Sequence, residues 1–133
     1  MPIRADLRWC YRGDWPAISR RIRTERAKNR CEWCGVENGR YIIRLGGGAF
    51  DYVDEDFGGC GECDGPKVTR VVLTVAHLDH DPRPPHLDTN LAALCQRCHL
   101  LHDRDQHAAS RGRTRRERER ATGQLELFTN DQD

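Results

Sequence analysis

Residues 31–34, CEWC, and residues 95–98, CQRC, are two Cys-x-x-Cys turns, and together they decide the fold. In each turn both thiolates can face one ion, and two such turns complete a tetrahedral Zn²⁺ shell. The ligands predicted for one structural zinc are therefore Cys31, Cys34, Cys95 and Cys98. The ion would join the start of the domain to its end and stabilise a small core.

The composition also favours a metal-stabilised domain. The chain has 133 residues, of which 37% are hydrophobic, enough for one compact domain with a small core. Seven cysteines without an export signal favour metal ligands over disulfides. No apolar run reaches the roughly 18 residues of a membrane span. We therefore expect a cytoplasmic protein that is neither membrane-bound, secreted nor a coiled coil.

Other potential metal ligands are interpreted as minor. Cys60 and Cys63 form a third Cys-x-x-Cys pair in the acidic, glycine-rich stretch 46–66. This pair could bind a second metal, displace an outer pair or be inert. An accessory or inert role is favoured because no fourth pair of ligands remains for it. Cys10 is interpreted as a packed thiol, and His86, among prolines, as a solvated loop residue.

Residues 14–29 predict a helix. Asp14 is a plausible N-cap, and Trp15, Ile18 and Ile22 line one face at helical spacing. Arginines occupy the other face, which predicts that the apolar face packs on the domain.

The remaining segments predict an α+β domain. The expected elements are a strand over 41–45, a mobile acidic loop over 46–66, a β-branched strand over 68–77 and a helix over roughly 97–110. The expected organisation is an N-terminal arm over 1–13, the zinc-stapled domain over 14–110 and an arginine-rich flexible tail over 111–133.

Charge is segregated along the chain, although the net formal charge is only +1. Residues 1–30 hold nine basic and three acidic residues, and residues 111–120 hold six arginines and two glutamates. Arginine offers the planar fork that suits phosphate, so both segments are predicted to bind DNA. The predicted contacts are Arg20, Arg21, Arg23, Arg26, Arg113, Arg115 and Arg116.

Histidines and an asparagine lie around the second Cys-x-x-Cys turn. Residues 75–80 read VAHLDH, and residues 90–99 read NLAALCQRCH. This pattern resembles the HNH (His-Asn-His) endonuclease family over about residues 14–107. The resemblance implies a ββα-metal fold supported by zinc knuckles.

The resemblance also implies three site roles. His77 would be the general base that activates water, and His99 would bind a catalytic Mg²⁺, Mn²⁺, Ni²⁺ or Zn²⁺. Asn90 would fix the loop that holds His77 in line. The scissile phosphate would lie between His77 and His99, which would face each other across it.

Ala76 departs from the family pattern. Many members carry Asp or His at this position as a second ligand of the catalytic metal. Asp103, one helical turn after His99, is the first choice for a replacement. His80 and His102 are the alternatives.

Residues 124–128, QLELF, resemble the peptide by which bacterial DNA-processing proteins bind the replicative sliding clamp. An extended tail would expose its apolar side chains unless a partner covered them, and the alternative is that they fold back on the domain. A clamp partner would place the protein in a bacterial or phage-infected cell. The predicted contacts are Gln124, Leu125, Leu127 and Phe128.

The function expected from these patterns is a metal-dependent HNH endonuclease that nicks or cleaves DNA. The alternative is a non-catalytic zinc-ribbon protein that binds DNA or regulates the sliding clamp. Ala76 favours the alternative, whereas His77 and His99 together favour the enzyme.

Overall fold

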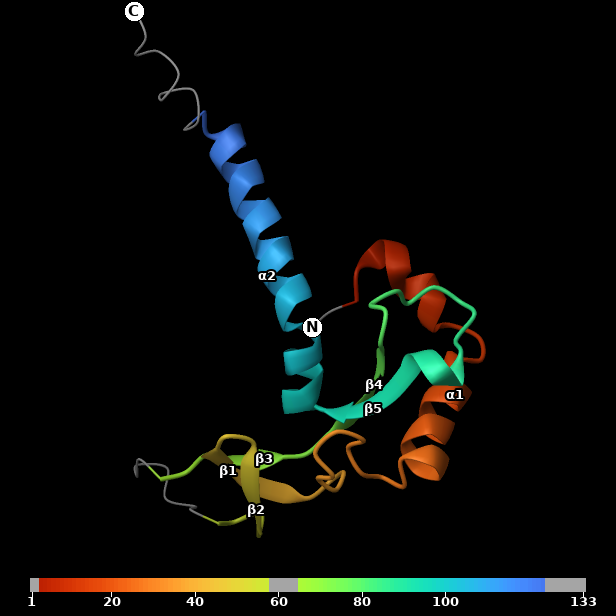
Figure 1. The fold of residues 1–133 in the computed structure, drawn as a ribbon, viewed down its shortest axis with the longest axis vertical. Helices are drawn as coiled ribbons and strands as arrows, with labels where there is room; N and C mark the ends of the chain where they lie inside the picture. Colours follow the sequence, from red (N-terminus) through yellow and green to blue (C-terminus); the bar gives the residue numbers. More distant parts are fainter. Residues whose placement is uncertain (1–2, 58–64, 124–133) are drawn as a thin grey trace, which may run out of the picture. The chain divides into compact units, whose positions relative to one another are not determined.

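The computed structural model describes residues 3–57 and 65–123 of the chain. It divides into two compact units, Met1–Leu100 and Leu101–Asp133. The first unit holds two small antiparallel sheets and the N-terminal helical segments (Figure 1). In chain order the elements are η1 (Ala5–Tyr11), α1 (Trp15–Arg21), η2 (Ile22–Arg26), β1 (Tyr41–Gly46), β2 (Ala49–Val53), β3 (Val68–Arg70), β4 (Leu73–His77), η3 (Asp88–Asn90), β5 (Leu91–Cys95) and α2 (Gln96–Ala121).

The antiparallel pair β4–β5 lies at the centre of the first unit. Leu73 pairs with Cys95 at one end, and His77 pairs with Leu91 at the other. All five residues of β5 are buried. Its sequence, LAALC, is rich in helix formers and does not by itself predict a strand. Burial on both faces outweighs this weak local preference.

Two apolar clusters pack against the β4–β5 hairpin, and the alternation of side chains along β5 places Ala92 and Leu94 in one and Leu91 and Ala93 in the other. We call these the metal-side cluster and the helix-side cluster. The metal-side cluster consists of Cys31, Val36, Ile42, Val71, Leu73, Ala76, Ala92, Leu94, Cys95 and Cys98, with Cys34 and Phe50 packed against it. The helix-side cluster consists of Ile22, Leu91 and Ala93, with Trp15, Ile18, Ala27 and Val75 packed against it.

The N-terminal helix is confirmed over a shorter range than predicted. α1 passes directly into the single π-helical turn η2, and the helical stretch ends because Lys28 and Asn29 adopt positive φ angles of 52° and 56°. The predicted N-cap is wrong. Asp14 has helical backbone angles and makes no side-chain capping hydrogen bond, whereas a capping residue is typically extended.

The second sheet corrects the prediction for residues 46–66. β2 pairs with β1 as an antiparallel hairpin, so residues 49–53 form a strand rather than a mobile loop. Gly46, Gly47 and Gly48 form the turn with φ angles of 90°, 58° and 92°, a backbone that favours glycine.

The strand predicted over 68–77 is divided in two. β3 joins β1 in the three-stranded sheet, whereas β4 pairs with β5 in the other sheet. Val71, between β3 and β4, is buried in the metal-side cluster. The break therefore keeps an apolar side chain in the core while the chain changes sheets.

The helix α2 is longer than predicted. It runs to Ala121, so residues 111–121 are helical rather than part of a flexible tail. An ion pair between Arg115 and Glu119, spaced four residues apart, supports this last part with a 2.8 Å N–O distance. No helix in the described part of the chain is long and apolar enough to cross a membrane.

Candidate metal centre and histidine site

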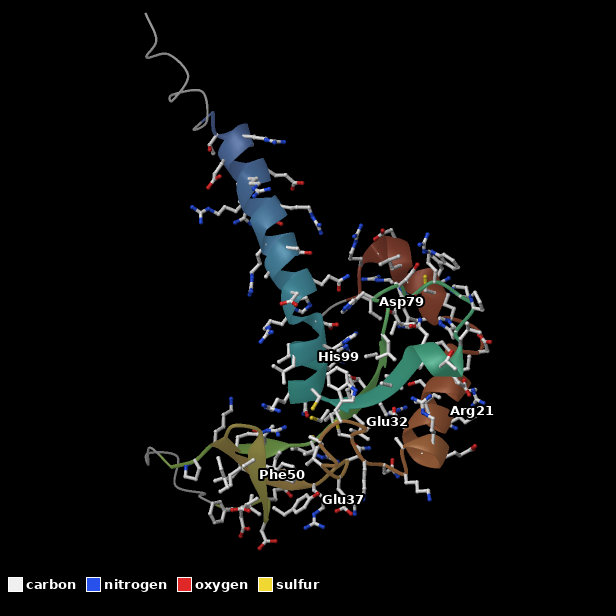
Figure 2. All side chains as sticks on the ribbon, viewed as in Figure 1. Arg21, Glu32, Glu37, Phe50, Asp79 and His99 are labelled. Atoms are coloured by element: carbon white, nitrogen blue, oxygen red, sulfur yellow. The ribbon has the colours of Figure 1, made fainter. Side chains whose placement is uncertain are left out.

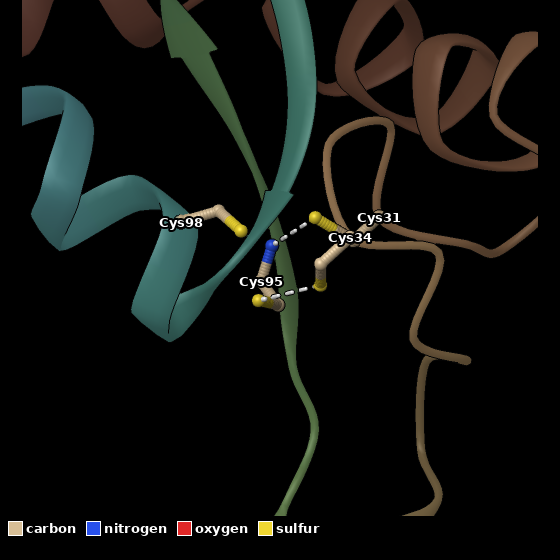
Figure 3. A group of neighbouring side chains, drawn as sticks. All are labelled: Cys31, Cys34, Cys95 and Cys98. Atoms are coloured by element: carbon tan, nitrogen blue, oxygen red, sulfur yellow. Dashed lines mark hydrogen bonds between the residues drawn. The ribbon is translucent and has the colours of Figure 1, made fainter. Parts of the chain in front are cut away.

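The four cysteines of the two turns meet at one point in the first unit. Cys31 and Cys34 come from the loop after η2, Cys95 ends β5, and Cys98 lies in the first turn of α2 (Figure 3). Their sulfur atoms all lie within 4.8 Å of one another, and those of Cys34 and Cys95 are 3.7 Å apart. A tetrahedral zinc with Zn–S bonds of about 2.3 Å would place its sulfur atoms about 3.8 Å apart. The predicted four-cysteine cluster is confirmed, and its geometry is consistent with a structural zinc ion.

The pKa of Cys31 shifts in the opposite direction from those of Cys34 and Cys98. Burial opposes ionisation of Cys31, but backbone N–H groups of Cys34 and Cys95 help lower its pKa to about 7. One of these donors, the Cys95 N–H, is 3.4 Å from the Cys31 sulfur. Burial raises the pKa of both Cys34 and Cys98. Cys31 therefore ionises more readily than Cys34 and Cys98, and metal binding at the cluster would release protons.

Arg44 places a cation beside the sulfur atoms, a feature that no sequence pattern indicates. Its Nη2 donates a hydrogen bond to the Cys95 sulfur at 3.8 Å. Its Nη1 is buried without a hydrogen-bond partner among the described residues. Four thiolates around Zn²⁺ carry a net charge of −2, so a partly buried guanidinium suits an occupied centre.

Glu32 connects the first cysteine turn to the helix and to β5 (Figure 2). Its carboxylate accepts two hydrogen bonds from Arg26, at 2.9 and 2.8 Å, and one from the Ala93 N–H at 2.5 Å. Arg26 also donates to the carbonyl groups of Asp88 and Leu91. Although burial opposes it, Arg26 helps hold the pKa of Glu32 below its usual range. These contacts give Arg26 a structural role in addition to its predicted contact with DNA.

His77 lies at the end of β4 and is 9% exposed. Its ring stacks on Trp15, with centroids 4.9 Å apart and an interplanar angle of 19°. Its Nε2 is 3.2 Å from Nδ1 of His86, whose Nε2 donates to the Cys10 carbonyl at 3.0 Å. Burial lowers the pKa of His77, and His86 lowers it further. The interpretation of His86 as solvated is wrong, because its ring is half-buried and bonded on both nitrogens.

Asn90 holds the turn that follows His77. Its side-chain oxygen accepts a hydrogen bond from the Asp79 N–H at 3.1 Å, and its carbonyl oxygen accepts one from the Leu78 N–H at 2.8 Å. The His80 N–H closes the turn by donating to the His77 carbonyl. The chain direction after His77 is therefore fixed by Asn90, which is the structural part of its predicted role.

His99 lies in the first turn of α2 (Figure 2) and contacts a different part of β4. Its Nδ1 is 2.7 Å from the Thr74 hydroxyl. Thr74 points to the opposite face from His77, because three positions along a strand reverse the direction of the side chain. The contacts therefore differ from the expectation that the rings face each other, since each ring has its own partners on its own side of the hairpin.

The other predicted ligands of a catalytic metal are divided between the two units of the chain. Ala76 is buried in the metal-side cluster and offers no ligand. His99 belongs to the first unit, whereas His102 and Asp103 belong to the second, where His102 Nε2 is 4.0 Å from the Asp103 carboxylate. A catalytic metal held by His99 and Asp103 stays a prediction.

Most of the arginines predicted to bind DNA are exposed, although several of them are also bonded within the protein. Arg21 forms an ion pair with Asp88 at 2.7 Å, and Arg23 donates to the Ser19 carbonyl. On α2, Arg113 donates to the Ser110 hydroxyl. The side chains that the structure describes as exposed are those of Arg20, Arg21, Arg26, Arg113, Arg115 and Arg116.

Two predicted sites fall outside the described residues. These are the third cysteine pair, Cys60 and Cys63, and the clamp-like motif over 124–128.

No protein-family model, curated protein or solved structure matches this chain.

Proposed function

We propose that the chain is a metal-dependent endonuclease that hydrolyses DNA phosphodiester bonds. The observation that carries the proposal is that Asn90 accepts two hydrogen bonds from the turn after His77, one at its side-chain oxygen and one at its carbonyl oxygen. A fixed general base at a strand end is what in-line attack on a phosphate needs. The order of β4, β5 and α2, with His99 in the first helical turn, adds support.

The proposed chemistry assigns one proton transfer to this chain. His77 takes a proton from water, the water oxygen bonds to phosphorus, and the bond from phosphorus to the 3′ oxygen breaks. The proposal assigns a divalent metal to His99 and Asp103, which when bound would stabilise the charge on the leaving oxygen. In this structure His99 contacts the side of the hairpin opposite to His77, so the two would have to reach one phosphate from different sides. The lowered pKa of His77 keeps its imidazole neutral near pH 7, the form a base requires.

Exposed arginines support DNA as the substrate. Arg20 lies on α1, and Arg113 and Arg116 lie on the arginine-rich part of α2. Contacts to phosphate position the duplex without reading its sequence, so the proposed enzyme has little intrinsic sequence preference. Docking on a bacterial sliding clamp through residues 124–128 remains part of this proposal and would supply the location on DNA.

A non-catalytic, zinc-stabilised DNA-binding module is the second candidate. Ala76 offers no ligand, His77 is covered by Trp15, and His99 contacts the opposite side of the hairpin. These three observations favour binding without hydrolysis.

One experiment separates the two functions. Supercoiled plasmid is incubated with zinc-loaded protein and Mg²⁺, Mn²⁺ or Ni²⁺, and the same protein is tested for binding to a short duplex. Metal-dependent nicking that His77→Gln and His99→Ala abolish, and that the matched control His107→Ala retains, supports the nuclease. Duplex binding without nicking in any metal refutes the nuclease and supports the module. Equal nicking by the wild type and all three variants indicates a contaminating nuclease and also refutes the nuclease proposal.

A further inference from the structure

A chain of hydrogen bonds links the backbone near the N-terminus to the end of β4. It runs from the Cys10 carbonyl through both nitrogens of His86 to Nε2 of His77, with N–O and N–N distances of 3.0 and 3.2 Å. Cys10 is buried, His77 is nearly so, and His86 is half-buried. His86 has no role in the proposed base or in the predicted metal sites, so the function of its two hydrogen bonds is not yet assigned.

The packing restricts both imidazole rings. Trp15 stacks on His77, and its ring centroid is also 4.7 Å from that of His86. Tyr11 meets the edge of the His77 ring at 6.2 Å between centroids. Because Trp15 contacts both histidines, neither ring can turn far without disturbing the other. The packing therefore keeps the two rings next to each other, and the hydrogen bonds select which nitrogens face each other.

The hydrogen positions follow from the end of the chain of bonds. A carbonyl oxygen only accepts, so Nε2 of His86 carries the hydrogen that it shares with Cys10. In neutral His86 the other nitrogen, Nδ1, is an acceptor. Nε2 of His77 must then be the donor between the two rings. A neutral His77 consequently holds its lone pair on Nδ1.

We propose that His86 is a positioning residue that uses the Cys10 carbonyl to hold His77 as the tautomer with its proton on Nε2 and its lone pair on Nδ1. The catalytic consequence rests on the proposed nuclease function, in which Nδ1 of His77 receives the proton of the attacking water. The resulting imidazolium keeps its Nε2–H bond to His86. The Cys10–His86–His77 hydrogen-bond relay therefore fixes the ring orientation of His77 in both protonation states.

The tautomer is measured directly by long-range ¹H–¹⁵N correlation NMR of the ¹⁵N-labelled, zinc-loaded full chain at pH 7. We expect the Nε2–H pattern for His77 in the wild type. His86→Phe keeps a ring against Trp15 but removes the acceptor, and should shift His77 toward a mixture of tautomers. His86→Gln offers both an acceptor and a donor, and should preserve the wild-type pattern. Leu87→Ala, a neighbouring residue that is 56% exposed, is the matched control.

Each outcome decides a separate claim. An Nδ1–H pattern for His77 in the wild type overturns the proposal, as does an unchanged pattern in folded His86→Phe. If His86→Phe does not fold, the wild type and His86→Gln still carry the test, and loss of the pattern in His86→Gln would count against the relay. Where plasmid nicking occurs, it should fall at least about tenfold in His86→Phe and recover in His86→Gln. A tautomer shift with unchanged nicking supports the relay and refutes His77 as the base.

Discussion

Removing the metal should unfold the first unit. The four-cysteine cluster ties the turn at Cys31 to the turn at Cys95, and closing a loop of about 65 residues removes about 4 kcal/mol of entropy from the unfolded chain. Zinc binding at structural sites contributes about 10–16 kcal/mol, which is as large as the whole stability of a typical domain, about 5–15 kcal/mol. Without the ion, the metal-side cluster would also surround four unliganded thiols.

The assay combines native mass spectrometry with thermal unfolding followed by circular dichroism. Cys95→Ser should lose the zinc ion and the cooperative transition, as should wild-type protein treated with a strong chelator. Cys10→Ser is the matched control, because it alters a buried thiol outside the cluster and should keep one ion. A chelated wild type that melts cooperatively within about 5 °C of the zinc-loaded protein would refute the reasoning. A second bound ion would indicate that Cys60 and Cys63 also bind metal.

Three further predictions follow from single contacts. Arg26→Gln should destabilise the fold by about 2 kcal/mol in urea unfolding, because it removes a charged donor from Glu32 and from two carbonyl groups. Arg44→Gln should weaken zinc binding about tenfold in chelator competition, whereas Arg44→Lys should retain part of the affinity. His77 should titrate below its ordinary pKa of 6.5 by NMR, because burial and His86 disfavour its charged form. The unfolded chain then binds more protons as acidity rises, so His77 lowers stability as the pH falls below about 6.5.

Each of these three has a clear contrary result. Arg20→Gln, an exposed arginine on the same helical segment, is the control for Arg26, and equal effects of the two changes would contradict the bridging role. Arg40→Gln, which loses a surface pair with Glu37, is the control for Arg44, and equal zinc affinities in both variants would contradict the charge argument. A His77 pKa at or above 6.5 would show that its charged form is not disfavoured.

The sequence predicts features that depend on short spacings. Two Cys-x-x-Cys turns imply a shared ion almost regardless of what lies between them, and the cluster of four cysteines is confirmed. The helical face of Trp15, Ile18 and Ile22 is likewise readable from its spacing, and it packs as part of the helix-side cluster. Ordinary amphipathic periodicity therefore accounts for the N-terminal helix.

Features set by tertiary contact are not readable in this way. β5 is a strand because both its faces are covered, although its alanines and leucines suit a helix. β2 is hidden by the glycines and acidic residues around it, yet those glycines form its hairpin turn. His86 becomes a partner of His77 only because its loop returns to the end of η1. In the histidine site, the sequence indicates the residues but not the side of the hairpin on which each imidazole lies.

The carboxylate of Glu32 has a consequence for how the protein responds to metal exchange. Glu32 follows the predicted ligand Cys31 in the sequence. Its carboxylate pairs with Arg26, which lies at the end of the N-terminal helical stretch. If loss of the ion moves the Cys31 turn, Glu32 would shift with it and, through Arg26, displace the helical segment that carries Arg20, Arg21 and Arg23. We therefore expect that loss of a metal from the four-cysteine cluster would also change the positions of these arginine side chains.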